Sequence, residues 1–261
     1  MEKLFKSLII KYLNCSKLNF KLTHMLIYGK NAVFHAIVSN SRIKKVLIYE
    51  NLKEKKRFIE LCSAKNINYE LVNKHKIEQI VNTDEHQGTI AYLEEELVVD
   101  VFENLRDFIE SDRRMILILD RIQDPRNLGS IIRTSQILGV KNIVSTYNKS
   151  CKITPSVIKS STGAIFYVKF SYYDNLNMVF KVLKENNIKI FVLERGGSFI
   201  EDVEILGKLA LVVGSEHYGV RRKFIEMSDK IVSLRQNETT INSYNVSIAV
   251  GIALYVINTK P

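Results

Sequence analysis

From residue 115 to residue 257, short apolar runs alternate with segments whose apolar residues recur at helical spacing. The apolar runs, which we expect to be strands, are residues 115–119, 141–145, 166–170, 189–193, 209–213 and 231–234. The helical segments are residues 128–138, 155–161, 174–187, 219–227 and 246–257. Strands that are apolar throughout and separated by helices predict an α/β domain with a parallel sheet covered on both faces. Ligands of such sheets bind at the carboxyl ends of the strands.

Residues 25–93 predict a second, smaller α/β domain. Its expected helices are residues 32–38, 53–64 and 74–81, and its expected strands are residues 46–49, 67–72 and 88–93. A linker, residues 94–112, separates it from the domain of residues 113–261 and carries eight acidic residues and one basic residue. Apolar residues at helical spacing predict an amphipathic helix in the second half of the linker; they are Val101, Leu105, Phe108 and Ile109.

Residues 1–24 form a basic N-terminal extension with five lysines and no arginine. We expect this extension to be dispensable, with folding starting at Met25 and the protein in the cytoplasm. Because the extension is basic, an organelle-targeting segment is the alternative.

The net charge of +10 is unevenly distributed, because both α/β domains are basic and the linker between them is acidic. Such a distribution favours contact with a polyanion such as nucleic acid. A lysine-rich, solvated surface accounts for much of the same charge, so charge alone favours nucleic acid only slightly.

Several classes of protein are excluded by the sequence. The three cysteines are widely spaced and the five histidines show no ligand spacing, so neither a disulfide scaffold nor a metal site is expected. No apolar run reaches the roughly 18 residues that a membrane span needs. The glycine-rich signatures of dinucleotide and nucleotide triphosphate sites are also absent.

Three polar clusters follow strand ends in the larger domain. The first, residues 120–129, leads into a helix that carries Arg133, and Asn127 is expected to cap that helix. In the second, residues 213–219, two glycines bracket Glu216; a cap of the following helix is the alternative role for this residue. Taken alone, each cluster is also explained as a capped turn.

The third cluster, residues 241–247, precedes the last apolar helix. Its simplest explanation is a helix cap by Ser243 or Asn245. Taken together, however, the three clusters resemble the three ordered motifs of the SpoU family of S-adenosylmethionine-dependent RNA 2′-O-ribose methyltransferases. Residues 27–33 and 86–91 further resemble the ends of that family's small, L30e-like RNA-binding domain.

The resemblance implies that S-adenosylmethionine binds in loops forming a C-terminal trefoil knot of the SPOUT type. The implied cofactor contacts are Gly214, Leu234, Ser243, Tyr244 and Asn245. Family members are typically dimers with the active site near the interface, so a homodimer is implied too.

A ribose hydroxyl is a poor nucleophile until its proton is taken or shared. The resemblance assigns this activation to Arg133, with Asn127 and Glu216 orienting it and the ribose. Ser243 and Asn245 would hold the site and the cofactor. Because a guanidinium keeps its proton in water, Arg133 either loses it in an enclosed site beside a phosphate or only positions that phosphate.

The RNA that the resemblance favours is large-subunit rRNA, modified at a guanosine. In the smaller domain the expected RNA contacts are Lys30, Arg42, Lys44 and Lys45, although a solvated basic face explains these residues comparably well. A tRNA substrate is the nearest alternative, but the tRNA enzymes of the family usually lack the small domain. A ribosomal adenosine is a further possible target.

A binding protein that has lost catalysis is the remaining alternative. It would have no need to keep all five catalytic positions, and the sequence keeps them. Three departures from the family pattern fall in the expected cofactor loops. These are His217 in place of glycine, Arg235 in place of proline and Tyr244 in place of leucine.

Overall fold

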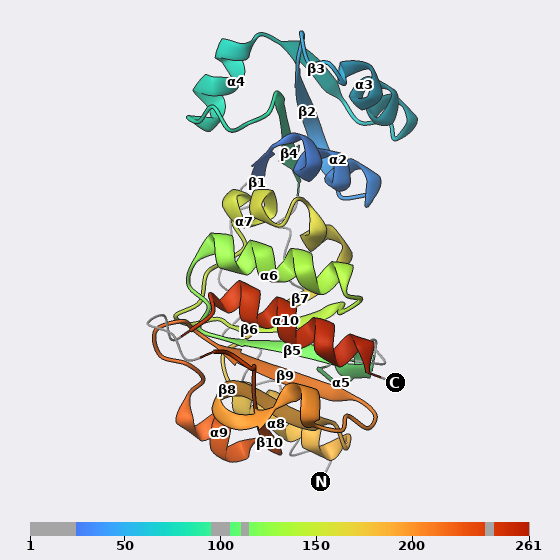
Figure 1. The fold of residues 1–261 in the computed structure, drawn as a ribbon. Helices are drawn as coiled ribbons and strands as arrows, with labels where there is room; N and C mark the ends of the chain where they lie inside the picture. The colour runs from blue at the N-terminus through green and yellow to red at the C-terminus, as the bar shows by residue number, and fades with distance from the viewer. Residues whose placement is uncertain (1–24, 95–104, 111–114, 238–242, 261) are drawn as a thin grey trace.

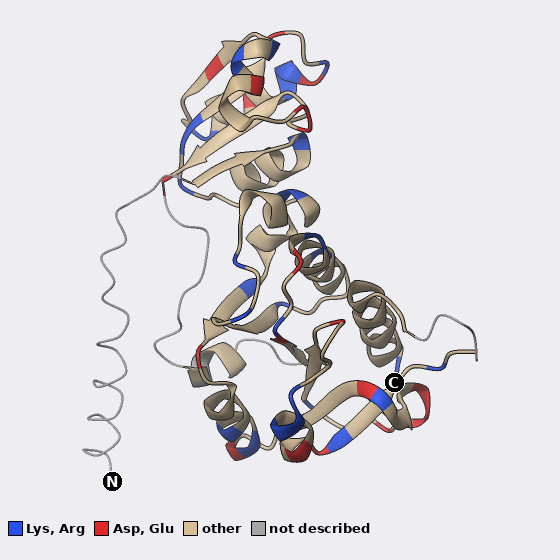
Figure 2. Ribbon diagram, turned by 90° about the vertical axis from the view of Figure 1, so that its left-hand side faces the viewer, with Lys and Arg blue, Asp and Glu red and all other residues tan. Residues whose placement is uncertain are grey.

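The computed structural model describes residues 25–94, 105–110, 115–237 and 243–260. Two α/β units follow one another along the long axis of the molecule, with residues 25–94 at one end (Figures 1 and 2). The predicted extension, residues 1–24, and Val101 of the linker lie outside the described residues.

The smaller unit is a four-stranded sheet in the order β1-β4-β2-β3, with three helices. Its elements are β1 (Met25–Tyr28), α2 (Lys30–Val38), β2 (Ile43–Tyr49), α3 (Lys55–Ala64), β3 (Tyr69–Val72), α4 (Lys74–Val81) and β4 (Thr89–Leu93). Every helix and strand predicted for this unit is present. Strand β1 was not predicted; its four residues pair antiparallel with β4.

The larger unit contains a six-stranded sheet in the order β10-β8-β9-β5-β6-β7, and all its neighbouring strands are parallel. Its strands are β5 (Met115–Asp120), β6 (Asn142–Thr146), β7 (Lys169–Tyr173), β8 (Lys189–Phe199), β9 (Leu209–Gly214) and β10 (Lys230–Ser233). The predicted parallel sheet is therefore confirmed. No helix in the described part of the chain is long and apolar enough to cross a membrane.

Helices cover both faces of this sheet (Figure 1). One face carries α6 (Pro125–Ile137), α7 (Pro155–Ser160) and α10 (Val246–Thr259), and the other carries α5 (Leu105–Glu110), α8 (Leu176–Glu185) and α9 (Arg222–Met227). The helix expected in the second half of the linker is α5, and its Phe108 and Ile109 pack against the sheet.

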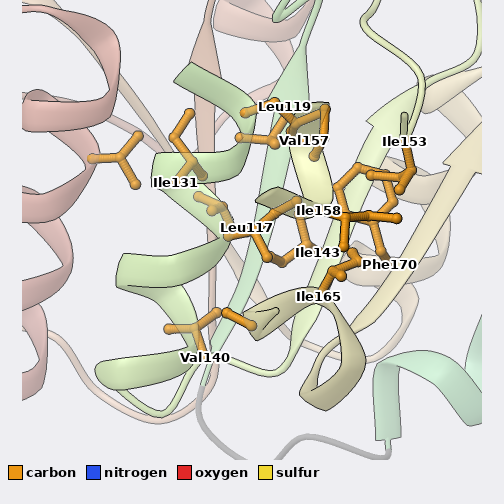
Figure 3. Packing of buried hydrophobic residues seen from close by; sticks show 14 of the residues in the cluster. Leu117, Leu119, Ile131, Val140, Ile143, Ile153, Val157, Ile158, Ile165 and Phe170 are labelled. Atoms are coloured by element: carbon orange, nitrogen blue, oxygen red, sulfur yellow. The ribbon is translucent and has the colours of Figure 1, made fainter. Parts of the chain in front are cut away.

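The central strand β5 is buried along its whole length, and successive side chains enter opposite cores. Leu117 and Leu119 pack with Ile131 of α6 (Figure 3). Ile116 and Ile118 join the core under α8. Each such side chain contributes about 1.5–3 kcal/mol when buried. The position of the residues that follow β5 is therefore fixed by both cores.

Several predicted elements differ from the structure in their bounds, and two of the differences follow from glycines. Residues 164–167 form a 3₁₀ turn, η1 (Ala164–Tyr167), rather than the start of a strand, because Gly163 turns the chain at φ 84°. The helix expected from Gly219 begins at Arg222, because Gly219 has φ 60° and its N–H bonds back to Ser215 in a tight turn.

The two units contact each other through α7 and η1 of the larger unit and β1 and α2 of the smaller one. His35 Nδ1 lies 2.9 Å from the Tyr167 hydroxyl. A Cβ atom built on Gly163 would lie 2.7 Å from that of His35, so the two backbones approach as closely as a glycine permits. Lys159 and Glu85 form an ion pair across the same boundary.

Candidate active site

The first polar cluster is positioned by the start of α6. Asp124 Oδ1 accepts hydrogen bonds from the N–H groups of Arg126 (2.7 Å) and Asn127 (2.9 Å), so Asp124 is the cap. The predicted cap, Asn127, is therefore wrong, because Pro125 occupies the first helical position and places the cap one residue before itself. The side chain of Asn127 instead forms a hydrogen bond with a residue outside α6.

The side chain of Asn127 meets residues from the other two clusters. Its Oδ1 accepts a hydrogen bond of 2.9 Å from Asn245 Nδ2, which also donates to Glu216 Oε1 at 2.5 Å. Asn245 caps α10, because its Oδ1 accepts a hydrogen bond from the Ser247 N–H at 3.0 Å. The sequence predicted this role for either Ser243 or Asn245. The three polar clusters therefore converge, and we call Asn127, Glu216 and Asn245 the central triad.

Glu216 has a structural role that differs from the predicted alternative. Its Oε1 accepts from the backbone N–H of Val246, at 3.0 Å, at the first position of α10. The helix that Glu216 caps is therefore α10 and not the following helix α9. A carboxylate is favoured at this end of a helix by the helix dipole.

Two of the five predicted catalytic residues lie outside these contacts. Arg133 is exposed on α6, six residues after Asn127, which places it about 120° around the helix and about 9 Å along it. Among the described residues, no hydrogen bond or ion pair joins Arg133 to the central triad. Ser243 is exposed just before the cap of α10.

The loop after β9 is folded tightly on itself. A Cβ atom on Gly214 would lie 2.0 Å from the carbonyl carbon of Gly219, so the two segments meet without side chains between them. Glu194 of β8 accepts a hydrogen bond from the Val220 N–H at 3.2 Å. The loop that carries Glu216 is therefore held from both ends.

A buried ion pair that the sequence analysis missed closes this loop. Asp120, at the end of β5, is 0% exposed and accepts from the N–H and the Nε of Arg221, both at 2.9 Å. Arg221 Nη2 lies 2.7 Å from Asp120 Oδ1. The signal in the sequence was a single acidic residue ending an otherwise apolar strand, because a buried charge requires a partner.

A pocket of about 350 Å³ lies where β8 and β10 end; its lining residues are Phe199, Arg235, Gln236, Asn237 and Tyr244. The Arg235 guanidinium lies 4.2 Å from the centre of the Phe199 ring and 2.5 Å from Asp202 Oδ2. The Tyr244 hydroxyl donates to the Arg235 carbonyl at 3.2 Å.

The pocket fits a small cofactor in size, since such sites have volumes of roughly 300–1,000 Å³. Its rings and amides suit a ligand with an aromatic heterocycle and polar arms. Of the predicted cofactor residues, Tyr244 lines it, Leu234 directly precedes Arg235, and Gly214 is buried in the tight loop described above. Phe199 was missed, because only the extension of β8 brings it here.

The basic residues predicted to contact RNA belong to the smaller unit. Figure 2 shows lysines and arginines on this unit, together with acidic residues. Lys30 forms an ion pair with Glu54 at 2.9 Å, and Lys45 forms one with Glu70 at 2.5 Å. Hydrogen bonds from Lys45 and Lys76 lower the pKa of Glu70 to about 2. Arg42 and Lys44 are exposed, and RNA contact by these four residues stays a prediction. Within the described ranges, no group of acidic, histidine and cysteine side chains could hold a metal ion.

Comparison with known proteins places the two units in one family. The model described as the SpoU rRNA methylase family matches residues 114–255, and that described as RNA 2′-O ribose methyltransferase substrate binding matches residues 26–97. YacO of Bacillus subtilis, assigned to the TrmH family of tRNA/rRNA methyltransferases, is 31% identical over 245 residues, covering 91% of this chain and 96% of its own.

Two solved structures share the fold over the same length. The SpoU methyltransferase AviRb of Streptomyces viridochromogenes, in complex with AdoMet, has a TM-score of 0.76 at 19% identity and covers 90% of this chain and 89% of its own. An AdoMet-bound rRNA methyltransferase of Sinorhizobium meliloti has a TM-score of 0.74 at 19% identity, with coverage of 90% and 86%. The chain therefore belongs to the SpoU methylase family and is an RNA methyltransferase, as its three ordered motifs predicted.

Proposed function

We propose that this protein transfers a methyl group from S-adenosylmethionine to a ribose 2′-hydroxyl of RNA, at a guanosine of large-subunit rRNA. The observation that carries the proposal is the central triad, in which three chain segments converge at the carboxyl edge of a parallel sheet. This is the edge where sheets of this kind bind ligands.

S-adenosylmethionine is the methyl donor that the pocket fits. Phe199 and Tyr244 provide flat surfaces for an adenine, and Gln236 and Asn237 provide amide hydrogen-bonding groups. AviRb and the Sinorhizobium meliloti enzyme, which share this fold, are the AdoMet-bound structures that support the choice. When bound, this cofactor supplies a methyl group that its sulfonium has already activated.

The residues of the chain then have to hold the ribose and take the proton that its 2′-hydroxyl loses, for which Glu216 is the carboxylate available in the central triad. Glu216 and Asn127 are fixed by Asn245, so their remaining lone pairs and N–H groups have set directions toward a substrate. Arg133 contacts the RNA backbone phosphate, which suits its planar fork of donors. Fixing the reacting groups in this way removes part of the entropic barrier to transfer.

A second copy of the chain completes the site in this proposal. Arg133 is exposed on α6, and so is Ile137 one turn further along the helix, at 69%. On α10, which packs beside α6, Ile248 and Tyr255 are 54% and 60% exposed. Three large apolar side chains exposed on neighbouring helices favour a protein–protein interface. A homodimer through this face covers them and brings Arg133 toward the triad of the partner. The trefoil knot belongs to the same proposal, because the start of α10 contacts Glu216 in the loop after β9.

The smaller unit supports rRNA as the substrate. It matches the substrate-binding model of the family, and the likeness to an rRNA methyltransferase extends over both units. The proposed location is the cytoplasm, in keeping with the free thiols of Cys62 and Cys151.

The test incubates the protein with radiolabelled S-adenosylmethionine and separate pools of rRNA and tRNA. We expect label in rRNA, loss of label with Arg133→Ala, and normal label with Arg222→Ala, a matched surface arginine on α9. Label confined to tRNA would overturn the rRNA assignment. Binding of RNA without any label would indicate a protein without catalysis.

A further inference from the structure

An exposed tyrosine lies at the carboxyl ends of β6 and β7, outside the residues discussed above. Tyr147 directly follows β6, is 45% exposed, and its N–H bonds to the carbonyl of Tyr173 at the end of β7. Beside it are Lys152 and Tyr172, and we call these three residues the stacking platform: Tyr147, Lys152 and Tyr172.

The ring of Tyr147 is held in place by its two neighbours. Lys152 Nζ lies 3.1 Å from the ring centre, covers one face of the ring, and also donates to the Tyr147 carbonyl. The ring of Tyr172 meets that of Tyr147 edge-on, with centres 6.1 Å apart and an angle of 83°. Tyr147 as a whole residue is 45% exposed, so part of its ring surface beyond these two contacts is open to solvent.

The platform is tied to the active site by a short chain of hydrogen bonds. The buried Tyr172 donates through its hydroxyl to the carbonyl of Cys151 at 2.8 Å, and the Cys151 N–H donates to the carbonyl of Ile122 at 2.7 Å. Ile122 belongs to the loop that leads from β5 to Asn127. A movement of this loop would therefore be transmitted to the platform.

The distance to the central triad suits a neighbouring nucleotide. In the sheet, β6 is next to β5, and β5 is next to β9, which precedes Glu216. Two strand spacings correspond to about 10 Å. The platform and the triad thus lie along the same edge, and an RNA strand crossing that edge reaches both.

The charge around the platform also suits RNA. Residues 147–152 contain two lysines and no acidic residue, and Lys149 is exposed at the turn. Grooves that hold single-stranded nucleic acid combine such cations with aromatic rings on which bases stack.

We propose that the exposed ring surface of Tyr147 stacks against the base of a nucleotide that flanks the methylated ribose. The inference rests on the proposed function, because it concerns the RNA held at that site. Lys152 holds the ring, and Lys149 contacts the backbone phosphate. The platform keeps the strand in register, so that the neighbouring ribose meets the central triad.

The first test compares Tyr147→Leu with Tyr147→Phe in binding to purified large-subunit rRNA at one salt concentration. We expect Tyr147→Phe to bind like the wild type, because it keeps the ring, and Tyr147→Leu to bind about tenfold more weakly. The KM for RNA should rise with the same variant, while the Kd for S-adenosylmethionine stays unchanged. Equal RNA binding by wild type and Tyr147→Leu would overturn the proposal.

The second test does not depend on turnover. The chain contains no tryptophan, so Tyr147→Trp introduces a single fluorescent indole at the platform. We expect rRNA to quench this fluorescence, and to leave that of the control Met178→Trp, at an exposed position of α8, largely unchanged. An unquenched Tyr147→Trp signal in an RNA-bound protein would overturn the stacking contact. If the wild type binds rRNA but transfers no methyl group, the proposed function fails and the fluorescence still decides this inference.

Discussion

Glu216 accepts a hydrogen bond of 3.0 Å from the backbone N–H of Val246, the first residue of α10. The same oxygen accepts from Asn245, which reaches Asn127 on α6. One carboxylate therefore caps a helix and organises the central triad. Two substitutions of Glu216 separate its contribution to protein stability from its contribution to methyl transfer.

Glu216→Ala removes both hydrogen bonds, while Glu216→Gln keeps one oxygen for the Val246 N–H. We expect Glu216→Ala to lower the free energy of unfolding by about 1 kcal/mol, as the loss of a helix cap does. Glu216→Gln should be closer to the wild type in stability. Methyl transfer should fall strongly in both variants, measured with labelled cofactor. A Glu216→Ala protein with full stability and turnover would contradict both roles.

The buried pair of Asp120 and Arg221 predicts a large loss of stability. Asp120→Ala leaves the partly buried Arg221 without its partner, which we expect to cost about 3 kcal/mol in denaturant unfolding. The loop that carries Glu216 should loosen too, so the KM for S-adenosylmethionine should rise. The control is Asp202→Ala, which removes an exposed ion pair with Arg235 and should cost less than about 1 kcal/mol. Equal losses in the two variants would argue against the buried pair.

The periodic elements were predictable from sequence, because apolar spacing directly reports which side chains face a core. Contacts between distant segments were not. Asn127 and Asp124 are both good cap residues, and only Pro125 between them showed which one would be used. The meeting of Phe199 with Arg235 depends on the length of β8, which continues through two glycines that break the apolar pattern.

The residues of the central triad were predicted from the sequence, but the contacts among them were not. The three ordered motifs identified Asn127, Glu216 and Asn245, but they did not show that Glu216 caps α10. Arg133 was assigned from the same motifs, yet it faces away from the triad within one chain. The homodimer proposed above is what would bring Arg133 to the triad of a second copy.

Gly163 predicts a test of the contact between the two units. Gly163→Ala adds a Cβ atom that would clash with His35 and strains a residue with φ 84°. Gly139→Ala is a matched control, because its φ is 77° and no atom lies within 4 Å of the added Cβ. We expect Gly163→Ala to lower the unfolding midpoint by several degrees more than Gly139→Ala. Equal midpoints would show that the units do not rely on this contact.

His86 predicts a loss of stability on acidification. Burial lowers the pKa of His86 below its ordinary value of 6.5, and its Nδ1 accepts the Gly88 N–H at 2.9 Å, which a protonated ring cannot do. Above about pH 6.5 the ring is neutral in both folded and unfolded chains, so stability is full. As the pH falls below that value, the unfolded chain binds a proton that the fold resists, and stability falls.

Burial and the nearby Arg57 lower the pKa of His35 in the same direction. Thermal unfolding between pH 7.5 and pH 5.5 should therefore show a falling midpoint. His86→Gln should reduce that slope, whereas the control His75→Gln, on the exposed helix α4, should not. A slope unchanged by His86→Gln would contradict the assignment.

The position of the transferred methyl group tests the central claim most directly. RNA labelled by the wild-type protein with radioactive S-adenosylmethionine is hydrolysed with alkali, which cannot cleave next to a methylated 2′-oxygen. The account predicts that the label is recovered in alkali-resistant dinucleotides and that Glu216→Ala abolishes it. Label recovered in mononucleotides would place the methyl group on a base and contradict the account.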